Sequence, residues 1–288
     1  MRSTMTGTVQ VIECPDSMRE LVRAAQSNGR RVGLVPTMGA LHEGHLSLVR
    51  ASTTECDVTA VTIFVNPSQF GANEDLDQYP RSLENDLAAL ESLAVEWVFA
   101  PQTAQMYGPG FSTWISPPEI AATLEGESRP GHFRGVCTIV LKLFQILPAD
   151  IVYFGQKDYQ QSQVIRAMAR DLDLPIEVSV QPTVRESDGL ALSSRNQYLN
   201  GADRQRALGL SRALQAAAAA VADGERSPQA VEQLMLSELR NAGVDEVEYA
   251  AVADAQTLAP VQNIDRPCVA LIAARVGQTR LIDNRLFE

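Results

Sequence analysis

The sequence predicts an α/β fold: a doubly wound, Rossmann-like parallel sheet in an N-terminal domain, followed by a smaller α+β C-terminal domain. Short apolar segments rich in β-branched residues alternate with helix-length segments over residues 9–180, which is the pattern of βαβ units. From about residue 202 the order changes to two helices and then three strands, which indicates a separate α+β domain. We therefore expect domains at residues 1–183 and 184–288.

The N-terminal domain is expected to contain strands joined by helices. Asp16 or Ser17 can cap the first helix, which should end near Gly29, and the second helix should run from the turn after Val35 to about Glu55. Apolar, β-branched runs favour buried parallel strands. The expected strands are Val9–Ile12, Arg31–Val35, Val58–Val65, Val95–Phe99, Asp150–Phe154 and Ile176–Val180, and the later helices are Leu83–Leu93, Val136–Leu147 and a segment ending near Asp171.

The remaining elements follow from loop composition and periodicity. Pro, Gly and Ser are frequent between Pro101 and Pro130, so a loop with a short strand at Thr113–Ile115 is expected there. The C-terminal domain should begin after a polar loop. Its expected helices are Ala202–Ala222 and Pro228–Asn241, and its expected strands are Val247–Val252, Cys268–Ala274 and Arg280–Asp283.

The composition is that of a soluble globular protein. Of 288 residues, 45% are hydrophobic and 20% charged, and the net charge of -11 repels polyanions, so nucleic acid is not an expected partner. Met1–Thr8 lacks the apolar core of a signal peptide, and the longest apolar segment, Val136–Leu147, is too short to span a membrane. The 4 cysteines form no Cys-x-x-Cys pair. We expect a cytoplasmic protein with reduced thiols and no membrane partner.

The segment Pro36–His45 carries the strongest functional signal. It lies between an apolar strand and a helix, where unpaired amides at the helix start favour phosphate, and ligands of open α/β sheets bind at that sheet edge. His42 and His45 are three residues apart, so both can donate hydrogen bonds from one helix face. The simpler interpretation, two polar loop histidines with one capping the helix, stays open for these residues alone.

Polar side chains follow other predicted strands, and each has a structural alternative. Gln69 can bind a polar substrate or belong to an ordinary Asn-Pro turn. His132 and Arg134 can face a ligand, or can be a helix-start cap and a surface charge. Lys157 can neutralise phosphate with Gln161 one turn later, or form a solvated pair with Asp158. The hydroxyls and guanidinium of Ser193–Arg195 can bind phosphate, although serine-rich segments are usually loops. Asp86, on a predicted helix, can be a solvated carboxylate.

Taken together, seven segments resemble the pantoate–β-alanine ligase (pantothenate synthetase) family, within the His-x-Gly-His nucleotidyltransferase superfamily. In the family's order, and over nearly the whole chain, they are Pro36–His45, Asn66–Gly71, Tyr79–Arg81, Arg129–Val136, Gly155–Gln161, Pro182–Glu186 and Ser193–Asn196. The resemblance implies ATP-dependent condensation of (R)-pantoate with β-alanine to pantothenate, AMP and pyrophosphate, through a pantoyl adenylate. It also implies a homodimer in which the C-terminal domain is a lid that contacts ATP.

The same resemblance assigns the site residues. In the implied reaction, His42, His45, Lys157 and Arg195 are the candidates for stabilising charge on the phosphates, and His42 matches the family's general-acid histidine. Gln69 and Gln161 match the pantoate-binding residues, and Gln69 is also a candidate for binding β-alanine. Asp86 matches an acidic ligand of the Mg2+ that accompanies ATP. Asn85 stands where relatives often carry a second acid, and Leu192 replaces a usual Met. The ATP-binding positions are Met38, Gly39, Ala40, Leu41, His42, Glu43, Gly44, His45, Gly155, Gln156, Lys157, Asp158, Val184, Leu192, Ser193, Ser194 and Arg195.

Two other functions stay open on the residues alone. A simple adenylyltransferase would use a phosphate rather than a carboxylate as the group that attacks ATP. A regulatory nucleotide-binding module would bind ATP without turnover, although binding alone would not require all four proposed catalytic residues. The sequence contains neither the Gly-x-Gly-x-x-Gly of Rossmann dehydrogenases nor the phosphate loop of P-loop enzymes.

Overall fold

The computed structural model describes residues 9–71 and 74–287, which form two compact units. Among the described residues, the first unit is made of 9–71, 74–118, 129–155 and 164–181, and the second of 119–128, 156–163 and 182–287. Met1–Thr8, where no signal peptide is expected, lies outside the described residues. In the described part of the chain, none of the helices combines the length and the apolar character needed to cross a membrane.

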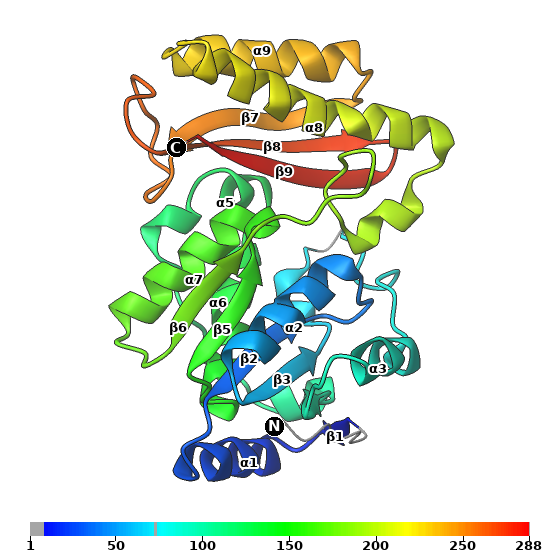
Figure 1. Cartoon of the computed structure of the whole chain (residues 1–288), viewed down its shortest axis with the longest axis vertical. Helices are drawn as coiled ribbons and strands as arrows, with labels where there is room; N and C mark the ends of the chain where they lie inside the picture. Colours follow the sequence, from blue (N-terminus) through cyan, green and yellow to red (C-terminus); the bar gives the residue numbers. More distant parts are fainter. Residues whose placement is uncertain (1–8, 72–73, 288) are drawn as a thin grey trace. The chain divides into compact units, whose positions relative to one another are not determined.

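The first unit contains a six-stranded sheet in which every pairing is parallel (Figure 1). Its order is β1-β4-β3-β2-β5-β6, which confirms the expected doubly wound fold. The winding reverses between β2 and β5, so the carboxyl ends of these two strands mark the usual ligand crevice of such sheets. The strands are β1 (Gln10–Ile12), β2 (Val32–Thr37), β3 (Val58–Ile63), β4 (Trp97–Phe99), β5 (Ile151–Gly155) and β6 (Glu177–Gln181).

Helices cover both faces of this sheet. Apolar residues of α2 and α3, such as Leu48 and Leu90, pack against Val35 and Val61 of the strands. Helices α1 and α6 contact each other, and the Arg19 side chain donates to the Gln145 carbonyl across them at 3.0 Å. The helices that lie wholly or partly in this unit are α1 (Pro15–Ser27), α2 (Glu43–Glu55), α3 (Leu83–Glu91), α4 (Thr103–Met106), α6 (His132–Ile146) and α7 (Tyr159–Asp171), with the 3-10 helix η1 (Pro67–Gln69).

Two local expectations are wrong. No strand forms at Thr113–Ile115, because the Ile115 amide donates to the Thr138 hydroxyl at 3.1 Å instead of to a strand partner. The helix expected from Val136 begins earlier, at His132, where Gly131 supplies a left-handed turn with φ 85°. The expected loop between residues 101 and 130 also contains short helices, namely α4, η2 (Glu119–Ala121) and α5 (Glu125–Ser128).

The second unit is built on an antiparallel sheet of order β7-β8-β9, so it has the expected α+β character. Helices α8 and α9 lie side by side along one face of this sheet (Figure 1). Tyr159, with Ile120 and Leu124, packs against Val269 and Leu271 of β8. The elements are β7 (Glu246–Asp254), β8 (Cys268–Val276), β9 (Thr279–Phe287), α8 (Gly201–Ala222), α9 (Pro228–Asn241), η3 (Gln156–Asp158) and η4 (Ser194–Tyr198), together with η2, α5 and the first turn of α7.

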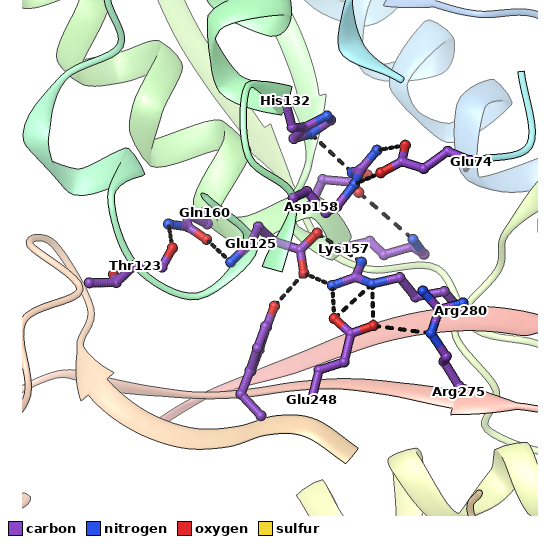
Figure 2. A network of polar contacts seen from close by, with 12 residues as sticks. Glu74, Thr123, Glu125, His132, Lys157, Asp158, Gln160, Glu248, Arg275 and Arg280 are labelled. Carbon is purple, nitrogen blue, oxygen red and sulfur yellow. Dashed lines mark hydrogen bonds and ion pairs between the residues drawn. The ribbon is translucent and has the colours of Figure 1, made fainter. Parts of the chain in front are cut away.

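The second unit therefore includes more of the chain than residues 184–288. It also takes in Glu119–Ser128 and Gln156–Gln163, which precede the expected boundary. Apolar contacts and an ionic cluster explain this. Figure 2 shows Arg280 of β9 beside the carboxylates of Glu125 and Glu248. The closest distances are 2.6 Å to Glu125 and 2.8 Å to Glu248. The Tyr249 hydroxyl also donates to Glu125, at 2.6 Å.

Candidate active site

The two histidines of the Pro36–His45 segment are fixed by the backbone at the start of α2. His42 is the N-cap residue, and its Nδ1 accepts from the Gly44 amide at 3.2 Å. Nδ1 of His45 accepts from the His42 amide at 3.4 Å, and the two ring centroids are 4.1 Å apart. Because a backbone amide only donates, the hydrogen of each neutral ring lies on Nε2. The turn thus presents two Nε2–H groups as donors suited to phosphate oxygens.

The backbone before these histidines is held by a buried carboxylate. Asp86 of α3 is 3% exposed and accepts from the amides of Ala40, at 3.0 Å, and Leu41, at 2.7 Å. Gly39 and Ala40 have φ of 82° and 52°, and a Cβ on Gly39 would lie 2.8 Å from Oδ2 of Asp86. Burial raises the pKa of the Asp86 carboxyl above its ordinary value, while the two amide hydrogen bonds oppose the rise.

Asp86 is therefore not a solvated helix carboxylate. Both of its oxygens accept backbone hydrogen bonds, so the carboxylate stabilises the turn that carries the histidines. Among residues 9–71 and 74–287, no group of three or more His, Cys, Asp or Glu side chains is arranged to hold a metal ion. The role of Asp86 as a magnesium ligand stays a prediction.

Gln69 lies at the carboxyl end of β3, on η1, and its side chain meets the histidine turn. Its Nε2 donates to the sulfur of Met38 at 3.2 Å, and its Oε1 accepts from Nδ2 of Asn66 at 3.0 Å. Asn66 is 1% exposed, and its own Oδ1 accepts from the Tyr107 hydroxyl and the Ser68 amide. These contacts fix the orientation of both carboxamides, so Gln69 presents its NH2 group as a donor.

The Gly131–Gly135 segment begins α6, with Gly131 as the N-cap residue, and its His132 side chain contacts Gln69. Nδ1 of His132 lies 2.8 Å from the Gln69 carbonyl oxygen. Arg134 is exposed, and its guanidinium lies 4.6 Å from the centre of the Trp114 ring. Of the two alternatives for this segment, His132 thus contacts a candidate substrate-binding residue, whereas Arg134 is a surface charge.

In the second unit, Lys157 is held on η3 directly after β5. Nδ2 of Asn284 donates to the backbone carbonyls of Gln156 and Lys157, both at 2.9 Å. Lys157 Nζ is 3.8 Å from the Asp158 carboxylate, and the lysine side chain is 20% exposed. Gln161 follows in the first turn of α7 and is half-buried. Lys157 is thus a largely buried cation on a short, fixed 3-10 turn. It does not form the solvated surface pair with Asp158 that the sequence left open.

The Ser193–Arg195 segment is also fixed within the second unit. Ser193 caps η4 by accepting from the Arg195 amide at 3.3 Å, and the Leu192 amide donates to the Val184 carbonyl at 3.0 Å. The adjacent Arg185 makes two hydrogen bonds to Asp283 of β9, at 2.7 and 2.9 Å. Ser193, Ser194 and Arg195 are each partly exposed.

The predicted residues divide into two sets, one in each unit. The first unit holds the histidine turn, Gln69, Asp86 and Gly155, and the second holds Gln156–Asp158, Gln161, Val184 and Leu192–Arg195. Reasoning from the residues did not find the Arg185–Asp283 pair, nor Gln160, whose carboxamide bonds Glu125, Ile120 and Thr123. Long-range pairs of this kind leave no local sequence signal.

Comparison with known proteins gives a consistent result. The family model described as pantoate-beta-alanine ligase matches residues 10–286. A pantothenate synthetase of Rhodopirellula baltica is 52% identical over 273 residues, covering 94% of this chain and 96% of that protein. A pantothenate synthetase of Thermotoga petrophila is 46% identical over 279 residues, covering 97% and 100%.

Solved structures extend the comparison to three dimensions. Pantothenate synthetase from Thermus thermophilus matches with a TM-score of 0.91 and 40% identity, over 96% of this chain and 99% of that chain. A pantoate-beta-alanine ligase from Francisella tularensis, complexed with beta-gamma ATP and beta-alanine, matches with a TM-score of 0.81 and 34% identity, over 96% and 97%. The chain belongs to the pantoate–β-alanine ligase family.

Proposed function

We propose that the protein condenses (R)-pantoate with β-alanine at the expense of ATP, releasing pantothenate, AMP and pyrophosphate. Membership of the ligase family over residues 10–286 is the observation that carries this proposal. The two Nε2–H donors of His42 and His45, at the carboxyl edge of β2, supply the chemistry that the family requires. The related Francisella tularensis structure, complexed with an ATP compound and beta-alanine, supports the same substrates.

The reaction proceeds in two steps because a carboxylate is a poor electrophile. In the first step a pantoate carboxylate oxygen attacks the α-phosphorus of ATP, a new P–O bond forms, and pyrophosphate leaves. In the second step the β-alanine amine attacks the carbonyl of pantoyl adenylate, the amide bond forms, and AMP leaves with loss of a proton. Negative charge concentrates on the α-phosphate and pyrophosphate during the first step, so fixed donors and cations there stabilise its transition state.

Four residues carry this role in the proposal. His42 and His45 donate to phosphate oxygens through Nε2–H, and Lys157 and Arg195 contribute positive charge. Gln69 and Gln161 bind pantoate, and Gln69 does so as a donor because its carbonyl is already held by Asn66. The other ATP-binding positions are Met38–Leu41, Glu43, Gly44, Gly155, Gln156, Asp158, Val184 and Leu192–Ser194.

Magnesium enters the proposal as the companion of ATP. When bound, it neutralises phosphate charge, chiefly through the phosphate oxygens themselves. Asp86 was the carboxylate assigned to it by resemblance, but its two amide hydrogen bonds fit an anchor of the histidine turn better than a metal ligand. We therefore assign Asp86 to the turn.

Three features of the whole protein also belong to the proposal. The resemblance supports a homodimer. Its mass, measured by size-exclusion chromatography with light scattering, should be twice that of one chain. The resemblance also supports a role of the C-terminal domain as a lid over ATP. Because the reaction consumes ATP, we place it in the cytoplasm.

The direct test supplies ATP, magnesium and pantoate, with and without β-alanine, and follows AMP and pantothenate. AMP and pantothenate should form in equal amounts only when all four components are present. Release of pyrophosphate with a phosphorylated acceptor, but not with pantoate, would indicate a simple adenylyltransferase. Binding of ATP without any turnover would indicate a regulatory module. Addition of a chelator should stop the reaction.

A further inference from the structure

The start of helix α6 and the 3-10 helix η1 are far apart in sequence but are fitted closely together. A Cβ added to Gly135 would lie 2.2 Å from the Ser68 carbonyl oxygen and 2.7 Å from the Gln69 amide nitrogen. Such distances leave no room for any side chain at this position. The Asn66 side chain also donates to the Gly135 carbonyl, at 3.4 Å. Gly135 thus lets the helix backbone approach the backbone that carries Gln69.

His132 adds a hydrogen bond whose direction is fixed by its surroundings. Nδ1 lies 2.8 Å from the Gln69 carbonyl oxygen, which only accepts, so Nδ1 carries the hydrogen. Nε2 lies 3.1 Å from Nη1 of Arg129, and a guanidinium only donates, so Nε2 is the acceptor. Both contacts are satisfied by one species, the neutral ring with its hydrogen on Nδ1. His132 is 8% exposed and is therefore held inside the fold.

Arg129, which fixes this tautomer, is itself fixed by Glu74. Its Nε and Nη2 donate to the two carboxylate oxygens of Glu74 at 2.7 and 2.6 Å. Glu74 and His132 are labelled in Figure 2. Burial alone would raise the pKa of Glu74, but hydrogen bonding to Arg129 lowers it below its ordinary value, so the carboxylate stays charged. The contacts run from Glu74 to Arg129 and from there to the Gln69 carbonyl. The shorter link passes through His132, at 2.8 Å, and Nη2 of Arg129 also donates to the same oxygen directly, at 3.4 Å.

We propose that His132 is a positioning residue for Gln69. Together with the close backbone approach at Gly135, His132 holds Gln69 where its carboxamide can bind pantoate. This inference rests on the proposed function. Neither residue needs to contact the substrate, because both act on the backbone of η1. Asn66 then sets which end of the carboxamide faces outward. The Gly131–Gly135 segment thus positions Gln69 in addition to starting helix α6.

The test uses substitutions that separate the two ring nitrogens. Asparagine places an amide NH2 near the position of Nδ1, and glutamine places one near Nε2. H132N should therefore keep the bond to the Gln69 carbonyl, whereas H132Q and H132F should lose it. Loss of one buried hydrogen bond should raise the KM for pantoate by about tenfold in H132Q and H132F, with the KM for ATP changed by less than about twofold. H132N should stay within about threefold of the wild type for both.

A control on the same helix separates positioning from general destabilisation. Thr138 is also buried on α6, but its hydroxyl bonds the Arg134 carbonyl and the Ile115 amide and not η1. T138V should lower the melting temperature without changing the KM for pantoate. Pantoate-dependent release of pyrophosphate is the assay, and if H132F does not fold, the comparison of H132N with H132Q decides.

Several results would overturn the assignment of His132. These are an equal rise of both KM values in H132Q, a KM for pantoate in H132N as high as in H132Q, or the same rise in T138V. A wild-type protein that does not use pantoate at all would refute the proposed function instead. G135A should raise the KM for pantoate in the same direction, since a methyl group there displaces Ser68 and Gln69.

Discussion

At the scale of single residues, the account rests on the hydrogens of two imidazole rings. Backbone amides occupy Nδ1 of both His42 and His45, so the fold selects the Nε2–H form of each ring before any substrate binds. Such preorganised donors lower the cost of charge development because they need no reorientation during the reaction. The capping role and the catalytic role of His42 therefore use different nitrogens of one ring.

This division of roles predicts different results for two substitutions of His42. H42N keeps an acceptor near Nδ1 and should preserve helix capping, but it lacks a donor near Nε2. Its kcat for pyrophosphate release should fall by about a hundredfold, the usual effect of removing one such donor, with the melting temperature little changed. H42Q carries its amide near Nε2 and should retain more activity with lower stability. The opposite order of activities would contradict the tautomer assigned here.

Asp86 gives a second prediction at this scale. D86N leaves one acceptor and turns an NH2 group toward one of the amides of Ala40 and Leu41, so the histidine turn should loosen. We expect kcat/KM for ATP to fall by about tenfold while the magnesium concentration for half-maximal rate stays unchanged. Glu84, which is exposed on the same helix, offers the control E84Q. A raised magnesium requirement in D86N alone would show that Asp86 is a metal ligand.

At the scale of elements, one ionic cluster explains why a segment from the middle of the chain joins the second unit. Arg280, Glu125 and Glu248 have side chains that are 17%, 9% and 13% exposed. Burial raises the pKa of the Tyr249 hydroxyl, which therefore stays protonated and donates to Glu125. These groups connect α5 to strands β7 and β9 of the same unit.

Removing the cation of this cluster should be costly. R280M would leave two largely buried carboxylates without the guanidinium between them, and it should lower the free energy of unfolding by roughly 3–5 kcal/mol. Arg275, on the neighbouring strand β8, is 46% exposed and pairs more loosely with Glu246 and Glu248, at 3.8 and 3.5 Å. R275M should therefore change stability by less than about 1 kcal/mol. Urea denaturation measures the free energy of unfolding of both variants. If R280M and R275M lose the same amount, burial is not what makes the cluster stabilising.

The elements also show what the sequence could predict and what it could not. Apolar, β-branched runs located the parallel strands, because buried strands need such side chains on both faces. The strand expected at Thr113–Ile115 fails because a side chain elsewhere, Thr138, takes the backbone hydrogen bond. The early start of α6 at His132 follows from the left-handed turn at Gly131, and the His132 side chain bonds Gln69, which is 63 residues away in sequence. Local patterns predict elements, whereas tertiary hydrogen bonds set their ends.

At the scale of the whole molecule, the site residues divide between the two units. The histidine turn and Gln69 were found because strand ends with glycine and polar residues mark ligand edges, and Lys157 follows β5 in the same way. The catalytic roles were assigned instead from the resemblance to the ligase family. Membership of that family is confirmed by the family model, which matches residues 10–286. The anchors Asp86 and Arg185 could not be assigned as such, because their partners are distant in sequence.

If both sets of residues serve one reaction, substitutions in either unit should stop the same step. H45A and K157A should each lower pantoate-dependent pyrophosphate release by about a hundredfold or more without altering the melting temperature by more than a few degrees. Both losses should appear without β-alanine, because they affect adenylate formation. Near-normal release in either variant, with slow pantothenate formation, would move that residue to the second step.

The most direct test of the central claim, a pantoyl adenylate formed from ATP, follows an oxygen atom. Pantoate labelled with a heavy oxygen isotope in its carboxylate is converted to pantothenate, and AMP and pyrophosphate are examined by mass spectrometry. We predict that one labelled oxygen per turnover appears in AMP and none in pyrophosphate, because the carboxylate attacks the α-phosphorus. Unlabelled AMP, or label in pyrophosphate, would contradict the account.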